Sequence, residues 1–116
     1  MQVILPAGEQ PVMPKPERTP ESVRAVIAVV DAPALPRFDA EWADAVALAR
    51  DEGSVLPVRR FTEEWWLWAA VRRWPSLATR LRECEQRAAR SADRSQARAA
   101  AAEIGAILNA AADAPV

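Results

Sequence analysis

The sequence predicts an all-α protein: a single small domain of four to five helices with a disordered, proline-rich N-terminal tail. Three observations lead to this prediction. The 116 residues include 26 alanines but only three glycines, and alanine is the residue that most favours helix. Apolar side chains recur at helical spacing in several stretches. Prolines and one glycine stand between these stretches, where helices begin and end.

Residues 1–18 are expected to form the flexible tail. Four prolines within this segment disfavour both helix and strand pairing. An alternative is that its short apolar run, Val3-Ile4-Leu5, docks as a strand or an anchor. The helical domain then occupies residues 19–116.

The first two helices are predicted at residues 20–31 and 36–52. Thr19-Pro20-Glu21 has the features of a helix start, because a capping hydroxyl precedes a proline and an acidic residue in the first turn. Gly53 follows the second helix, where a left-handed C-terminal cap is expected. The two apolar stripes comprise Val23, Val26, Ile27 and Val30, and then Phe38, Trp42, Ala45, Val46 and Ala49.

Three further helices are predicted at residues 57–74, 76–90 and 94–112. Pro75 sets the first boundary, since the residue before a proline disfavours the helical conformation. Asp93 followed by Gln96 resembles a capping box, which indicates a new helix start. The fourth and fifth helices could instead be continuous, with a change in the phase of the apolar stripe.

The composition argues against an enzyme. The chain has no histidine, which excludes the common triads and histidine-ligated metal sites, and it has no glycine-rich phosphate loop. Cys84 lies in an apolar stripe and is expected to be a core thiol. We expect no catalytic residue, no metal ligand, no cofactor and no small-molecule substrate.

The same features predict a cytoplasmic protein. A single cysteine permits no internal disulfide, which fits a reducing compartment. There is no apolar run long enough to span a membrane and no secretory leader.

The third predicted helix is apolar on two sides. One side carries Val58, Phe61, Trp65, Trp68 and Ala69, and the other carries Leu67, Val71 and Trp74, with Trp66 between them. Such a helix is either buried on both sides or exposes one side to a partner. Tryptophan is enriched at interface hot spots, which favours a partner, but both alternatives remain open.

The fifth predicted helix has an alanine-rich stripe that supplies little burial per residue. It packs on the rest of the domain, or it becomes ordered only against a partner or a second copy of the chain. The candidate partner-binding residues are Trp66, Leu67, Val71, Trp74, Ile104, Ile107 and Leu108.

Nucleic acid is the alternative partner. Residues 65–116 hold eight arginines and five acidic residues, whereas residues 1–64 hold seven basic and eleven acidic residues. Arginines within residues 72–98 could follow a phosphate backbone. A solvated helix face is the simpler interpretation, because Glu83 and Arg87 can pair internally and no helix-turn-helix spacing or zinc motif is present.

Residues 19–74 resemble a family of small actinobacterial proteins of unknown function. The matching elements are Thr19-Pro20-Glu21, then Phe38, Glu41, Ala45 and Ala49, then Leu56-Pro57, and finally Trp65-Trp66 with Ala69. The double tryptophan is the most unusual of these. The resemblance implies no catalytic residues, and it implies kinship with antitoxin-like partners of small toxins.

Together these observations predict a non-catalytic, partner-binding protein, of an antitoxin-like kind, that binds a small protein or a second copy of itself. The alternative is a small nucleic-acid-binding transcriptional regulator that uses the arginine-rich segment 72–98.

Overall fold

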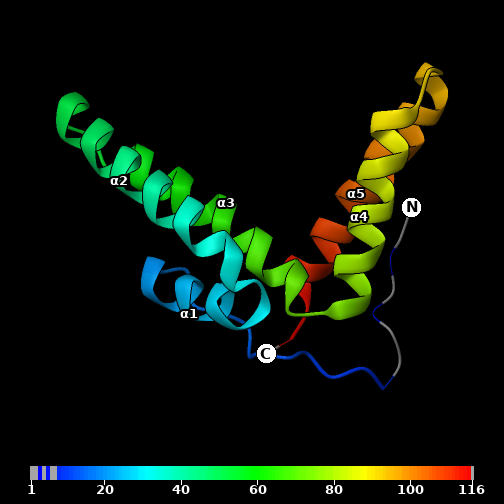
Figure 1. Ribbon diagram of the computed structural model, residues 1–116, viewed down its shortest axis with the longest axis horizontal. Helices are drawn as coiled ribbons and strands as arrows, with labels where there is room; N and C mark the ends of the chain where they lie inside the picture. Colours follow the sequence, from blue (N-terminus) through cyan, green and yellow to red (C-terminus); the bar gives the residue numbers. More distant parts are fainter. Residues whose placement is uncertain (1–2, 4, 6–7, 116) are drawn as a thin grey trace. The chain divides into compact units, whose positions relative to one another are not determined.

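The computed structural model describes residues 3, 5 and 8–115, and within them the chain is helical without strands (Figure 1). The elements are α1 (Pro20–Val30), the short 3-10 helix η1 (Ala32–Ala34), α2 (Leu35–Glu52), α3 (Leu56–Arg72), α4 (Pro75–Arg90) and α5 (Arg94–Asp113). The predicted all-α fold is confirmed, and every α-helix begins and ends within two residues of its predicted bounds. Across the described residues, none of the helices combines the length and the apolar character needed to cross a membrane.

Local sequence signals explain where the helices begin and end. The Thr19 hydroxyl accepts a hydrogen bond from the Ser22 backbone N–H at 3.2 Å, which is the expected N-terminal cap of α1. Gly53 ends α2 with φ 63° and ψ 37°, a left-handed conformation that glycine adopts without strain. The Asp93 carboxylate accepts from the Ser95 backbone N–H at 2.8 Å, so α4 and α5 are separate helices.

The chain folds as two compact units. The first unit, residues 15–69, contains α1, η1, α2 and most of α3. The second unit comprises residues 1–14 and 70–116, and it contains the end of α3 with α4 and α5.

Aromatic side chains form the core of the first unit. The Phe38 ring centroid lies 4.9 Å from that of Phe61 and 5.3 Å from that of Trp65, and Trp42 lies 5.4 Å from Phe61. Such pairs contribute roughly 0.5–1.5 kcal/mol each beyond the area they bury. The helix α1 adds Val23, Val26 and Ile27, which are buried. The core therefore consists of the stripes that the sequence predicts.

The second unit is built on the pair α4 and α5. Leu77, Leu81 and Cys84 of α4 are buried, as are Ala100 and Ile107 of α5. Alanine allows the two helix backbones to approach closely, so a helix with few large apolar residues still packs along its length. Of the two alternatives for the fifth helix, the structure shows packing against its neighbour α4.

The described part of the N-terminal segment, residues 8–18, contains neither helix nor strand, as its prolines predict. In the second unit, the Val12 backbone N–H donates to the Arg73 carbonyl at 2.8 Å. The Glu9 carboxylate accepts from the Ser76 backbone N–H at 3.0 Å. These bonds hold residues 9–12 against the start of α4 and the residue that follows α3.

Of residues 3–5, for which docking on the domain was the alternative, the structure describes residues 3 and 5. Val3 and Leu5 are half-buried and line a hollow with Ala106, Ala110 and other residues of α5. Ile4, between them, lies outside the described residues.

Candidate functional site

The second apolar side of α3 is buried. In the first unit Trp66 is buried and Leu67 is half-buried. In the second unit Val71 and Trp74 are buried. Three of the four candidate residues here therefore offer no free surface to a partner. Of the two alternatives left open by the sequence, the structure shows internal burial.

Trp66 is covered by the chain that precedes α1. Its indole N–H donates to the Pro16 carbonyl at 2.9 Å. The Arg18 guanidinium lies 3.8 Å from the centre of the ring, and Arg18 also pairs with Glu63. A cation over an aromatic face is attracted by the negative charge of that face. The proline-rich segment before α1 thus covers the Trp66 ring.

The candidate residues on α5 are divided between core and surface. Ile107 is buried, whereas Ile104 and Leu108 are half-buried. Ile107 therefore belongs to the core with α4, and only the other two reach the surface.

Arg73, one of the arginines of segment 72–98 considered for nucleic-acid binding, is fully buried. Its guanidinium donates to the Met13 carbonyl at 3.2 Å and to the Pro115 carbonyl at 2.7 Å. Burial lowers the pKa of this side chain, because removal from water disfavours the charged form. Arg73 cannot contact a phosphate backbone from this position, which removes it from the arginines considered for nucleic-acid binding. Nothing in the sequence distinguishes it from its exposed neighbours.

An open groove of about 520 Å³ lies between α2 and α3 in the first unit. Its apolar lining comprises Ala45, Leu48, Leu56, Pro57 and Phe61. Its charged lining comprises Glu41, Asp44, Glu52, Glu64 and Arg60. Four carboxylates against one guanidinium give the groove a net charge of −3 at neutral pH. The groove was not predicted from the sequence, because Leu48 and Leu56 lie outside the apolar stripes that mark the core sides of α2 and α3.

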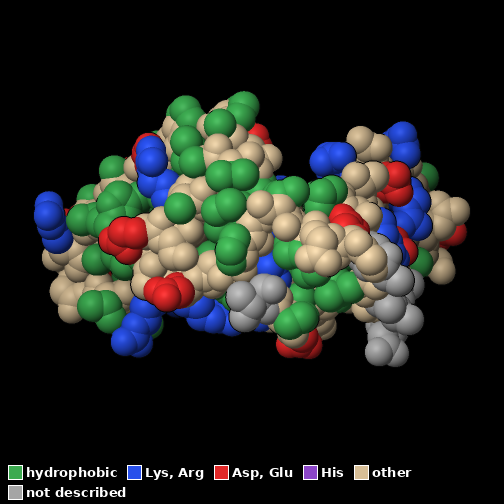
Figure 2. All heavy atoms as spheres, turned by 90° about the horizontal axis from the view of Figure 1, so that it is seen from below, with side chains coloured by type: hydrophobic (Ala, Val, Ile, Leu, Met, Phe, Trp, Pro, Cys, Tyr) green, Lys and Arg blue, Asp and Glu red, His purple; other side chains and the backbone are tan. Residues whose placement is uncertain are grey.

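Two of the leucines in the groove are conspicuously exposed. Leu48 is 48% exposed and Leu56 is 51% exposed, and Val55 beside them is 61% exposed. Hydrophobic side chains also reach the surface at several places on the face that Figure 2 shows, with charged groups among them. Clustered exposed apolar side chains with a polar rim are typical of a surface that another molecule covers.

Glu41 has a defined orientation in the groove. Its carboxylate accepts a hydrogen bond from the Trp65 indole N–H at 3.2 Å and pairs with Arg37 at 3.3 Å. Glu41 on α2 and Glu64 on α3 line the part of the groove that is farther along both helices from the α2–α3 turn. Leu48 and Leu56 lie nearer that turn. Carboxylates therefore stand at both ends of the groove, Glu41 and Glu64 at the inner end and Glu52 at the outer end, where Leu48 and Leu56 also lie.

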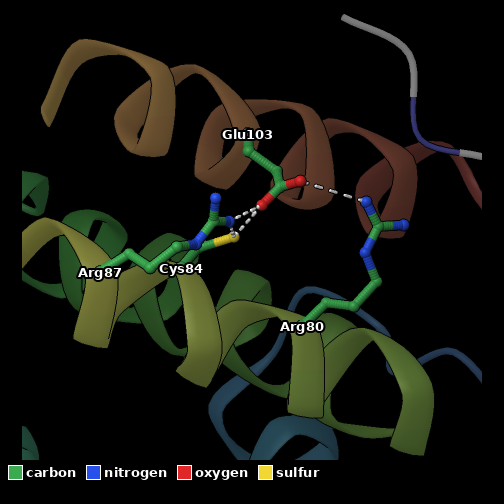
Figure 3. A network of polar contacts seen from close by, with 4 residues as sticks. All are labelled: Arg80, Cys84, Arg87 and Glu103. Carbon is green, nitrogen blue, oxygen red and sulfur yellow. Dashed lines mark hydrogen bonds and ion pairs between the residues drawn. The ribbon is translucent and has the colours of Figure 1, made fainter. Parts of the chain in front are cut away.

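A second polar cluster joins α4 to α5 in the other unit (Figure 3). Glu103 of α5 accepts hydrogen bonds from the Cys84 thiol and from Arg87, and it pairs with Arg80 at 3.5 Å. Burial raises the pKa of the Cys84 thiol, and the hydrogen bond to Glu103 raises this pKa further. A buried, protonated thiol is a poor nucleophile. The prediction of a core thiol is confirmed by its burial.

Protonation of Glu103 is expected to weaken the packing of α5 on α4. The hydrogen bond from Cys84, with further contributions from Arg87 and Arg80, lowers the pKa of Glu103 from its usual value of 4.5. A carboxylate whose pKa is lowered in the folded state stabilises that state above the unfolded pKa, and this stabilisation is lost as the pH falls through the folded pKa. The Glu103→Gln variant should therefore be less stable than the native chain at pH 7, and this difference should be smaller at pH 3. Urea denaturation at both pH values checks this, and an unchanged difference at pH 3 would contradict it.

The fold and the groove together identify the chain as a small all-α protein with an acidic groove between two antiparallel helices. The chain belongs to a family of unknown function (DUF6247), whose sequence profile matches residues 11–111. No curated protein and no solved structure matched the chain. The profile extends well beyond the segment 19–74 that carries the resemblance noted above, and it includes most of α5.

Proposed function

We propose that this protein is a non-catalytic, partner-binding protein and that its partner docks in the α2–α3 groove. The observation that carries this proposal is the exposure of Leu48 and Leu56 inside a groove lined by four carboxylates. Burial of a leucine side chain contributes about 1.5–3 kcal/mol, so a partner that covers both gains affinity from them. The carboxylates add selection by charge, because complementary potentials steer association and disfavour other partners.

The partner we propose is a protein segment that carries apolar side chains and is flanked by lysine or arginine. The groove lining spans residues 41–52 of α2 and residues 56–64 of α3. At 1.5 Å per residue these stretches are about 12–16 Å long, which is the length of two to three helical turns. An amphipathic helix laid in a groove is a common mode of recognition. Its basic residues would lie at the inner end, near Glu41 and Glu64, and its apolar residues near Leu48 and Leu56.

Site-specific photo-crosslinking in the native cells tests this proposal. A photoreactive amino acid placed at position 48 is expected to give one dominant protein adduct, and mass spectrometry should map that adduct to a basic, apolar segment. The matched control is position 29, because Val29 is an equally exposed apolar residue (58%) on α1 that does not line the groove. The Glu41→Gln/Glu64→Gln variant should reduce the adduct at position 48 several-fold.

Two outcomes would overturn the proposal. One is the same set of adducts from positions 48 and 29, which would show that the groove is not a selective surface. The other is an adduct whose crosslinked segment is acidic, or whose yield is unchanged in the Glu41→Gln/Glu64→Gln variant.

A narrower form of the proposal is that the partner is a small toxin and that this chain is its antitoxin. The resemblance to antitoxin-like proteins supports this form, as does the charge selection in the groove. Co-expression of the crosslinked partner should then inhibit growth, and the native chain should restore growth. A Leu48→Ser/Leu56→Ser variant that restores growth equally well would exclude the groove from this role.

A further inference from the structure

A hollow of about 430 Å³ lies in the second unit, at the turn that joins α4 to α5. It is lined by Arg87, Arg90, Ser91, Gln96 and Ala99. Because α4 ends at Arg90 and α5 begins at Arg94, the lining comes from the last turn of one helix and the first turns of the next.

The side chains of this hollow are hydrogen-bond donors of the kind that phosphate accepts. Arg87 and Arg90 each present a planar guanidinium with several N–H groups, which suits the oxygens of a phosphate better than an ammonium does. The Ser91 hydroxyl lies 3.3 Å from the Asp93 carbonyl and 3.4 Å from the Gln96 amide oxygen, which leaves the Gln96 amide NH₂ as a donor towards the hollow. The lining carries two positive charges and includes no carboxylate, and one of these charges, that of Arg87, is paired with Glu103 of α5.

The nearby carboxylates are already engaged. Glu103 is shared between Arg80, Arg87 and the Cys84 thiol, and the Asp93 carboxylate accepts from the Ser95 backbone N–H. Arg87 is oriented by its bonds to Cys84 and Glu103, yet its side chain is 55% exposed. A guanidinium that is held in place and still reaches solvent loses little freedom when an anion binds.

We propose that this hollow binds a phosphate group, supplied by a small phosphorylated molecule or by the backbone of a nucleic acid. Arg90 and Arg87 contact the phosphate oxygens, and Ser91 and Gln96 complete the contacts. This site is independent of the partner groove and does not rest on the function proposed for it.

Titration of ¹⁵N-labelled protein with inorganic pyrophosphate tests the site by NMR, with sodium chloride used to keep the ionic strength constant. Saturable shifts are expected for the backbone amides of residues 91–99. The Arg90→Gln variant should bind at least fivefold more weakly. The matched control is Arg82→Gln, because Arg82 is an exposed arginine of the same helix that does not line the hollow, and this variant should bind like the native chain.

The proposal is overturned by shifts that do not saturate, or by an equal loss of affinity in the Arg82→Gln variant. Melting curves check that both variants remain folded, as is expected when an exposed arginine is replaced. A parallel titration with a short single-stranded oligonucleotide identifies the source of the phosphate. Tighter binding of the oligonucleotide, with a salt dependence that is weaker in Arg90→Gln, supports a nucleic-acid backbone. Binding of pyrophosphate alone supports a small phosphorylated molecule.

Discussion

Replacement of Arg73 by alanine is expected to lower the free energy of unfolding by about 2–5 kcal/mol, the range found when a large buried side chain is truncated to alanine. The substitution leaves the carbonyls of Met13 and Pro115 without the guanidinium that they accept from. An acceptor left unpaired away from water costs about 1–3 kcal/mol, and the loss is smaller at Pro115, which is exposed and can be hydrated. It also removes a large, fully buried side chain, and the resulting cavity adds to the loss.

Urea denaturation followed by circular dichroism measures this effect. Arg73→Met retains the apolar stem and loses only the hydrogen bonds, so its loss should be smaller, at about 1–3 kcal/mol. Arg82→Ala is the surface control, with an expected change within about 0.5 kcal/mol. If Arg73→Ala proves no more destabilising than Arg82→Ala, the two carbonyl bonds do not hold the unit together.

Replacement of Trp65 by alanine should lower the free energy of unfolding by about 3–5 kcal/mol, as is usual for a buried tryptophan or phenylalanine. Trp65 is buried, and its ring centroid lies 5.3 Å from those of Phe38 and Trp68. An alanine at this position would leave a cavity among these rings. The loss should appear in urea denaturation of the full chain, followed by circular dichroism because the substitution alters the fluorescence.

Two further variants separate the contributions of Trp65. Trp65→Phe keeps a ring in the core but loses the bond to Glu41, so a loss of about 1–2 kcal/mol is expected. Leu48→Ala changes an exposed residue of α2 and should cost far less. A Trp65→Ala variant as stable as Leu48→Ala would show that the aromatic cluster is not the core of this unit.

The helices were predictable because their signals are local. Thr19, Gly53 and Pro75 act on residues within a turn of themselves, and the structure places helix ends beside each of them. Apolar periodicity is also a local signal, and it indicated which side of each helix faces the core. The elements of this fold can therefore be read from segments of the sequence a few residues long.

The surfaces were not predictable, because they depend on which segments meet. A helical wheel shows that α3 is apolar on two sides, but it does not show that residues 15–18 cover Trp66 through a backbone carbonyl. Backbone acceptors are present in every residue, so such a contact leaves no signature in the sequence. The exposure of Leu48 likewise depends on the groove that α2 and α3 leave between them. Both features required the arrangement of the helices in space.

The two carbonyls that Arg73 binds come from residues close to opposite ends of the chain. Contacts between residues so distant in sequence carry a large loop-closure entropy, which is recovered only after the intervening helices have formed. Both segments must therefore be in place before Arg73 has its two carbonyl partners, so the burial of this one cation depends on contacts that span most of the chain.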